Sequence, residues 1–151
     1  MPVSYLRRAK SSDLEQLVSF LEDNGLPTIG VESCYPNFVI ATDETGAMLG
    51  VAGLEIYGQS ALLRSVAVQK NSRRMGHGRT LVDAVLRSAK QNGVHTIYLL
   101  TESAFDYFKH LGFDLVDRND IDEAVMTSLE FTECCSTALA MRKTIRSIRE
   151  D

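Results

Sequence analysis

The run HTIYLLT, residues 95–101, constrains the fold more than any other stretch of the chain. It is apolar, β-branched and aromatic, and it lacks the alternation of apolar and polar residues that is typical of a strand with one wet face. A strand of this kind is buried on both faces and lies in the middle of a sheet, as a parallel strand does. We therefore expect a mixed sheet that is covered by helices on its faces.

Other runs supply the remaining strands. Residues 4–9, SYLRRA, predict a short strand. The β-prone runs on either side of Asp43–Gly46, followed by Ala61–Val68, predict an antiparallel meander of three strands. Two later strands are predicted in FDLVDR, residues 113–118, and STALAMRKTI, residues 136–145.

The helices are predicted from apolar residues that recur every three or four positions. In the first helix Ser11 or Ser12 is the expected cap, and Asn24 with Gly25 is the expected end. The predicted buried positions of the two long helices are Leu14, Leu17, Val18 and Leu21, and Leu81, Val82, Val85, Leu86 and Ala89. Residues 104–112 predict a short helix, and residues 121–131 a helical patch.

Length and charge limit the functions that the chain can have. Its 151 residues fit one domain, 1–151, and its net charge of -4 argues against a general binder of nucleic acid or of anionic membranes. The sequence has no apolar run of transmembrane length and no signal-peptide pattern, which predicts a cytoplasmic protein.

Cysteine usage agrees with a reducing compartment. Cys34, Cys134 and Cys135 form neither a disulfide framework nor a zinc spacing. The adjacent pair Cys134–Cys135 leaves two interpretations open, a site for a soft metal or metalloid and a pair of small buried thiols.

A charged turn, SRRMGHGRTL at residues 72–81, precedes the second long helix. Gly76 and Gly78 can adopt positive φ and let a ligand approach the backbone, while the helix start supplies free N–H groups and a positive dipole end. Arg73, Arg74 and Arg79 can add charge-assisted hydrogen bonds, so the turn predicts a phosphate site. The alternative is a solvated turn that only shapes the start of the helix.

This turn and a second segment resemble the GNAT superfamily of N-acetyltransferases, and the resemblance covers essentially the whole chain. Arg73, Gly76 and Gly78 stand in the superfamily's R/Q-x-x-G-x-G/A pattern after a strand ending in V-A-V, and FKHLGF, residues 108–113, looks like its helix-to-strand signature. The resemblance implies an α/β fold with a mixed, mostly antiparallel central sheet and helices on both faces.

More narrowly, GLEIYG, LLRSVAV, IYLLT and FKHLGF look like the N-acetyltransferases encoded with arsenic-resistance genes, and more distantly like the acetyltransferase domain of N-acetylglutamate synthases. These relatives suggest a small amino-acid-like acceptor of the glutamate, phosphinothricin or arsinothricin type. Its amine would attack the thioester directly in a ternary complex.

The resemblance also implies a co-substrate site for acetyl-CoA, with no metal, and the family habit suggests a homodimer. Strand backbone would hold the acetyl and pantetheine groups, and the turn would hold the pyrophosphate. The implied contacts are Val66, Ala67, Val68, Arg73, Arg74, Met75, Gly76, His77, Gly78, Arg79 and Thr80.

The general acid is a departure from the family pattern. Phe108 stands where many members have a tyrosine that protonates the leaving thiolate. Tyr107 is offset by one residue, or about 100° around a helix, so we expect it to pack on the sheet instead. Water is then the expected proton source.

Glu55 and Glu102, on or beside central strands, are the candidates for the general base, and each could equally be a strand-edge charge in solvent. His77 and His110 titrate near neutrality, and we expect both at the surface.

Arg64 interrupts the apolar run ALLRSVAV, and its burial demands a partner. Alternation places it on the face of Leu62, Val66 and Val68, where it could bind an anionic group of the acceptor. An ion pair with Glu55 is the competing interpretation. Ser136 and Thr137, in the last strand, are further polar candidates.

Two other functions stay open at this point. A CoA-binding sensor or scaffold would need the same turn without efficient chemistry, and Phe108 favours it slightly. An acetyltransferase for protein lysines or N-termini would need an open or acidic cleft, which Arg64 argues against.

Overall fold

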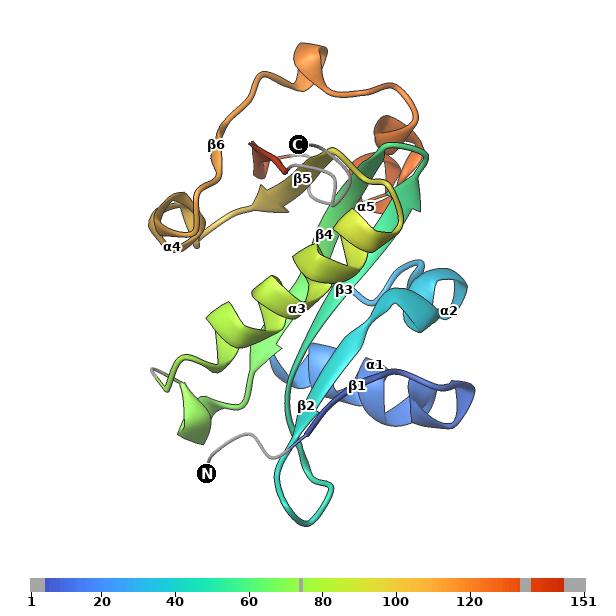
Figure 1. Cartoon of the computed structure of the whole chain (residues 1–151), viewed down its shortest axis with the longest axis vertical. Helices are drawn as coiled ribbons and strands as arrows, with labels where there is room; N and C mark the ends of the chain where they lie inside the picture. The colour runs from blue at the N-terminus through green and yellow to red at the C-terminus, as the bar shows by residue number, and fades with distance from the viewer. Residues whose placement is uncertain (1–4, 74, 134–136, 146–151) are drawn as a thin grey trace. The chain divides into compact units, whose positions relative to one another are not determined.

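The computed structural model describes residues 5–73, 75–133 and 137–145, and the chain divides into two compact units (Figure 1). The first unit comprises residues 1–54 and 65–86, and the second comprises residues 55–64 and 87–151. Three elements run from one unit into the other: β3 (Met48–Tyr57), β4 (Ser60–Val68) and α3 (His77–Gln91).

Seven strands form one sheet in the order β1-β2-β3-β4-β5-β7-β6. The β4–β5 pair is parallel, whereas β1–β2, β2–β3, β5–β7 and β6–β7 are antiparallel. This confirms the predicted mixed, mostly antiparallel sheet, in which β5 (Thr96–Thr101), the strand predicted from residues 95–101, lies between β4 and β7.

The first unit begins with a strand and a helix whose start differs from the prediction. Ser11 and Ser12 belong to a 3-10 turn and are not caps. Asp13 stands at the N-cap position of α1 without a side-chain cap hydrogen bond, and its carboxylate instead accepts the preceding Lys10 amide at 2.7 Å. Arg7 donates two hydrogen bonds to the same carboxylate, at 2.7 and 2.9 Å, and this pairing lowers the pKa of Asp13 to about 2. The elements of this unit are β1 (Tyr5–Arg8), η1 (Ser11–Asp13), α1 (Leu14–Asp23), α2 (Val31–Cys34), η2 (Tyr35–Asn37), β2 (Val39–Thr42) and η3 (Lys70–Ser72).

Helices cover both faces of the sheet in this unit. Leu17 and Leu21 of α1 are fully buried in one cluster with Val51 of β3. A Cβ built on the preceding residue, Gly50, would stand 2.8 Å from the Leu81 side chain of α3. Successive strand residues point to opposite faces, so α1 and α3 pack on opposite sides of β3, as predicted.

The second unit holds shorter elements than the sequence predicts near its end. The predicted strand 113–118 is a two-residue strand paired with β7, and the patch 121–131 contains two separate short helical turns. Its elements are β5, α4 (Phe105–His110), β6 (Asp114–Leu115), η4 (Arg118–Asp120), η5 (Val125–Thr127), α5 (Leu129–Thr132) and β7 (Leu139–Thr144). Its core cluster comprises Leu62, Tyr98, Ile121, Val125 and Ala140.

None of the described helices combines the length and the apolar character that a membrane span requires.

Gly53 of β3 gives a test of the packing in the first unit. A Cβ at this position would stand 2.3 Å from the ring of Phe38, which is fully buried. We expect Gly53→Ala to lower the free energy of unfolding by about 1–3 kcal/mol, the usual cost of overpacking, measured by urea denaturation.

The double variant Gly53→Ala with Phe38→Leu is the control. If the ring is the obstacle, the two losses are not additive, because the smaller side chain makes room for the new methyl group. Strictly additive losses would contradict this contact.

Candidate functional site

The turn between β4 and α3 leaves open space above its backbone. Gly76 has a φ of 82°, which a side chain adopts only at a cost, and no heavy atom lies within 4 Å of the position where its Cβ would stand. Gly78 differs from the prediction, because it is the second residue of α3 and does not have a positive φ. One glycine therefore makes the turn, and the other lies in the first turn of the helix.

Backbone N–H groups at the start of α3 are available to a ligand. The amide of Thr80 donates to the carbonyl oxygen of Gly76 at 3.1 Å, which closes the first helical turn. The amides of His77, Gly78 and Arg79 precede this bond, and in the first turn of a helix such groups have no intrahelical acceptor. With the positive end of the helix dipole and the exposed Arg79 side chain, they form a site suited to an anion.

Arg73 ties this turn to the first helix. Its Nε donates to the carbonyl oxygen of Val68 at 3.1 Å, and its Nη2 donates to Oδ1 of Asn24 at 3.0 Å. Both acceptors are neutral, so these contacts hold the guanidinium in place without cancelling its charge. The predicted contact Arg74 lies outside the described residues, and Met75 is exposed.

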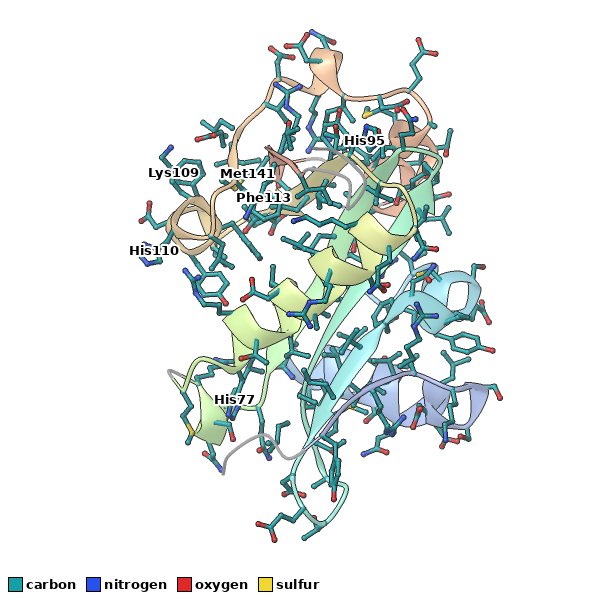
Figure 2. All side chains as sticks on the ribbon, viewed as in Figure 1. His77, His95, Lys109, His110, Phe113 and Met141 are labelled. Carbon is teal, nitrogen blue, oxygen red and sulfur yellow. The ribbon has the colours of Figure 1, made fainter. Side chains whose placement is uncertain are left out.

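His77 is buried, contrary to the prediction of a surface position. It is the first residue of α3 (Figure 2), its exposed fraction is 6%, and its Nδ1 has no hydrogen-bond partner. The ring turns into the protein, so only the backbone of His77 is placed to meet a ligand at the helix start. His110, on α4, is exposed as predicted (Figure 2).

A groove of about 510 Å³ lies beside the turn in the first unit. It is lined from α1, the start of β3 and the segment after β4, by Gln16, Ser19, Phe20, Asp23, Asn24, Ala47, Met48, Gln69 and Lys70. None of residues 76–80 lines it, so the anion site is formed by the start of α3 and not by this groove.

Strand β4 changes conformation at Ser65, which has a φ of 59° and is buried. Side chains alternate only along extended backbone, so the predicted common face of Arg64, Val66 and Val68 no longer follows from alternation. Among the described residues the parallel β4–β5 ladder also stops at Leu62–Tyr98, although β4 continues to Val68. The backbone of Val66 to Val68 therefore lacks β5 as a ladder partner.

In the second unit, Arg64 forms the ion pair that the sequence left as one of two interpretations. Its side chain is completely buried, and its Nη1 lies 2.8 Å from Oε2 of Glu55. The other oxygen of Glu55 accepts a hydrogen bond from the Tyr57 hydroxyl at 2.5 Å. Both oxygens of Glu55 are thus engaged by other side chains of the second unit, and its role as the base stays a prediction.

Glu130, a residue that sequence reasoning missed, completes this group. Its Oε2 lies 3.5 Å from Nε of Arg64, and only 5% of the residue is exposed. Burial raises the pKa of Glu130, the charge of Glu55 raises it further, and the charge of Arg64 opposes both. Glu130 lies in a short helix, α5, so no periodic pattern marks it. The only signal was the need of a buried arginine for partners.

The other candidates of this unit have partners of their own. Glu102 is exposed and accepts a hydrogen bond from Thr137 Oγ1 at 3.1 Å. Thr137 precedes β7 and is not in it, contrary to the prediction. Tyr107 is 42% exposed and its ring is in edge contact with that of Phe108, which is the buried ring and in turn contacts Phe113.

Cys34 is buried and forms no disulfide, and its thiol donates a hydrogen bond to the carbonyl oxygen of Gly30 at 3.3 Å. Cys134 and Cys135, the pair for which the sequence left two interpretations open, lie outside the described residues, as does Ser136. Within the part of the chain that the structure describes, no three His, Cys, Asp or Glu side chains gather as metal ligands would. Independence from metal stays a prediction.

Comparisons with known proteins identify the family of the chain. Residues 8–113 match the model of the acetyltransferase (GNAT) family. The chain is 28% identical over 83 residues to the amino-acid acetyltransferase of Pasteurella multocida (strain Pm70), a match that covers 54% of this chain and 19% of that protein.

Two solved structures show the same fold. N-acetylglutamate synthase from Neisseria gonorrhoeae, complexed with coenzyme A and N-acetyl-glutamate, has a TM-score of 0.81 at 17% identity, over 94% of this chain and 35% of that one. Rv2747 from Mycobacterium tuberculosis, in complex with CoA, has a TM-score of 0.79 at 18% identity, over 94% and 99%. The chain thus spans about a third of the gonococcal synthase and about a fifth of the Pasteurella protein.

Glu130→Gln tests the electrostatics of the buried charges. A carboxyl whose pKa is higher in the folded than in the unfolded state stabilises the fold when protonated, and this contribution is lost as pH rises above the ordinary glutamate value. Glutamine stays neutral at every pH. We therefore expect the melting temperature of the variant, relative to that of the unchanged protein, to increase as pH rises from about 4.5 to 8. Thermal unfolding across this range measures it, and a difference that does not change with pH would contradict the raised pKa.

Proposed function

Because the chain belongs to the acetyltransferase (GNAT) family, we propose that it binds acetyl-CoA at the turn between β4 and α3 and transfers the acetyl group to the amine of a small amino-acid-like acceptor. The observation that carries the proposal is the open backbone at Gly76, followed directly by the free N–H groups of a fifteen-residue helix. This site suits the pyrophosphate of the co-substrate.

Each part of the site would hold one part of acetyl-CoA. The amides from Gly76 to Arg79 would bind the pyrophosphate, the Thr80 hydroxyl would lie beside them, and the side chains of Arg73 and Arg79 would add charge. The backbone of Val66, Ala67 and Val68, which lies beyond the end of the β4–β5 ladder, would bind the acetyl carbonyl and the pantetheine arm. Hydrogen bonds to the carbonyl oxygen stabilise the negative charge that develops there in the transition state.

The reaction is a direct attack of a neutral amine on the thioester. The acceptor arrives as an ammonium ion, which must lose a proton before its nitrogen can form the new bond to carbon. The C–S bond then breaks and CoA leaves as a thiolate. Phe108 is buried and has no ionisable group that could donate a proton, so water protonates the thiolate in this proposal.

The acceptor class rests on the relatives. A Pasteurella relative is named for amino-acid acetylation, and the gonococcal synthase structure holds N-acetyl-glutamate. With the resemblance to the enzymes of arsenic-resistance genes, this favours glutamate, phosphinothricin or arsinothricin. Arg64 would recognise the acceptor's anionic group only by exchanging one of its carboxylate partners. We further propose that the enzyme acts in the cytoplasm as a homodimer.

Arg79→Gln tests the co-substrate site. Loss of one charge-assisted hydrogen bond to pyrophosphate costs roughly 1.5–3 kcal/mol, so we expect acetyl-CoA to bind about ten- to a hundredfold more weakly in calorimetric titration. Arg87→Gln is the matched control, because it removes the same charge from the same helix about 12 Å further along, at an exposed position. Equal losses in both variants would overturn the assignment to the helix start.

An acceptor panel tests the reaction. We expect CoA thiol release with at least one of glutamate, phosphinothricin and arsinothricin, and none with lysine peptides. Turnover of a peptide instead would make the protein an acetyltransferase for other proteins. Tight binding of acetyl-CoA without turnover of any acceptor would favour a sensor, the function that the buried Phe108 also permits.

A further inference from the structure

We propose that the groove beside the turn, in the first unit, is a second small-molecule site whose ligand is a free amino acid, with one ammonium and one carboxylate group. The groove belongs neither to the proposed pyrophosphate site nor to the backbone that would hold the acetyl group, because none of residues 66–68 and 76–80 lines it. Its volume of about 510 Å³ falls within the range of small-ligand sites, about 300–1,000 Å³.

Two exposed side chains of opposite charge line this groove from different segments. Asp23 is the last residue of α1, and Lys70 is the first residue of η3, the turn that follows β4. Among the described residues neither side chain has an ion-pair partner, and the two do not pair with each other. A ligand that carries both a cation and an anion can satisfy both charges at once, whereas an ion of one sign would leave one of them unpaired.

The position of Asp23 gives an independent reason to expect a cation. The C-terminal end of a helix carries partial negative charge, so cations stabilise it and carboxylates do not. The last turn of α1 contains no basic residue and ends with Glu22 and Asp23. An ammonium group bound at Asp23 would offset both the carboxylate and the helix dipole. Lys70, on the other segment, would then take the ligand's carboxylate.

The rest of the lining suits the body of an amino acid. Met48 is buried at the start of β3 and Phe20 is half-buried on α1, so together they offer an apolar surface. Gln16 and Ser19, one turn apart on α1, form no side-chain hydrogen bond with a described residue, and both can donate and accept one. An apolar surface with a few polar groups around it is typical of small-ligand sites.

Asn24 connects this groove to the turn that would bind acetyl-CoA. It lines the groove, and its Oδ1 accepts Nη2 of Arg73 at 3.0 Å. Its Nδ2 donates to the carbonyl oxygen of Phe20 at 2.8 Å, which fixes the amide at the end of α1. The amino acid would thus hold together the same two segments that the bond between Asn24 and Arg73 joins.

This connection predicts that the two ligands assist each other. An amino acid in the groove would stabilise the arrangement in which Asn24 holds Arg73, and so it would tighten acetyl-CoA binding. Acetyl-CoA would tighten amino-acid binding by the same factor. The link, unlike the groove site itself, rests on the proposed function, because Arg73 affects binding only if the turn holds the pyrophosphate.

Nuclear magnetic resonance of the whole isotope-labelled chain tests the groove site without acetyl-CoA. The probes are the common free amino acids, with β-alanine and γ-aminobutyrate to vary the separation of the two charges. We expect at least one probe to shift the backbone amide signals of Ser19, Asp23 and Lys70 in a saturable way. The expected dissociation constant is about 0.1–10 mM, because few contacts hold so small a ligand. If no probe shifts these signals in that range, the proposal is overturned.

Derivatives of the amino acid that binds best test the role of its charges. The N-acetyl derivative lacks the ammonium group, and the carboxamide derivative lacks the carboxylate. We expect each to bind about two- to tenfold more weakly than the parent, since both protein charges are exposed and partly screened by water. Equal affinities of the parent and both derivatives would contradict a site for a zwitterion.

Variants of the chain assign the two charges to their residues. We expect Asp23→Asn to lose the preference for the parent over its N-acetyl derivative, and Lys70→Gln to lose the preference over the carboxamide. Glu22→Gln and Lys10→Gln are the matched controls, because they remove the same charges at exposed positions of the same unit that do not line the groove. Preferences that survive Asp23→Asn and Lys70→Gln would overturn the assignment.

Calorimetric titration with acetyl-CoA, with and without a saturating amount of the bound amino acid, tests the link. We expect the amino acid to raise the affinity about fivefold or more, and to leave it unchanged in Asn24→Ala. An affinity in the unchanged protein that does not depend on the amino acid overturns the link. A chain that shows the groove shifts and binds no acetyl-CoA would instead overturn the proposed function, while the groove site stands.

Discussion

The buried guanidinium of Arg64 is the constraint on which the second unit depends. An ion of this size loses several kcal/mol of hydration when it leaves water, and only close partners of opposite charge offset that loss. Glu55 is such a partner in sequence as well as in space, since it lies in the strand before β4. Glu130 reaches the same group from an irregular connection, and through this contact the segment that precedes β7 is held against β4.

The residue after Arg64 sets the conditions for co-substrate binding. The positive φ of Ser65 ends the regular part of β4, and the ladder with β5 has already stopped at Leu62. A regular strand would use its N–H and C=O groups for pairing. Here those of the last residues of β4 are not taken up by the β5 ladder, and the chain then enters the open turn at Gly76. Strand β4 thus carries a charged side chain at Arg64 and, after Ser65, backbone groups that are not paired with β5.

The sequence predicted the regular elements well and the site only in part. Periodicity identified α1, α3 and β5 because each buries a repeating apolar pattern, and the motif located the turn. It could not predict that His77 points inward, that Gly78 is helical or that Ser65 breaks the alternation, since these depend on packing around single residues. The partner of Arg64 in α5 was out of reach for the same reason, because no local pattern marks a contact between distant segments.

The start of α3 and the surroundings of Arg64 have opposite electrostatics. The start of α3 offers N–H groups, a helix dipole and arginines to a polyanion. Arg64, by contrast, is completely buried, with its guanidinium against the carboxylates of Glu55 and Glu130 at 2.8 and 3.5 Å. The two carboxylates differ in their surroundings. Burial and the charge of Glu55 raise the pKa of Glu130, and the charge of Arg64 lowers it.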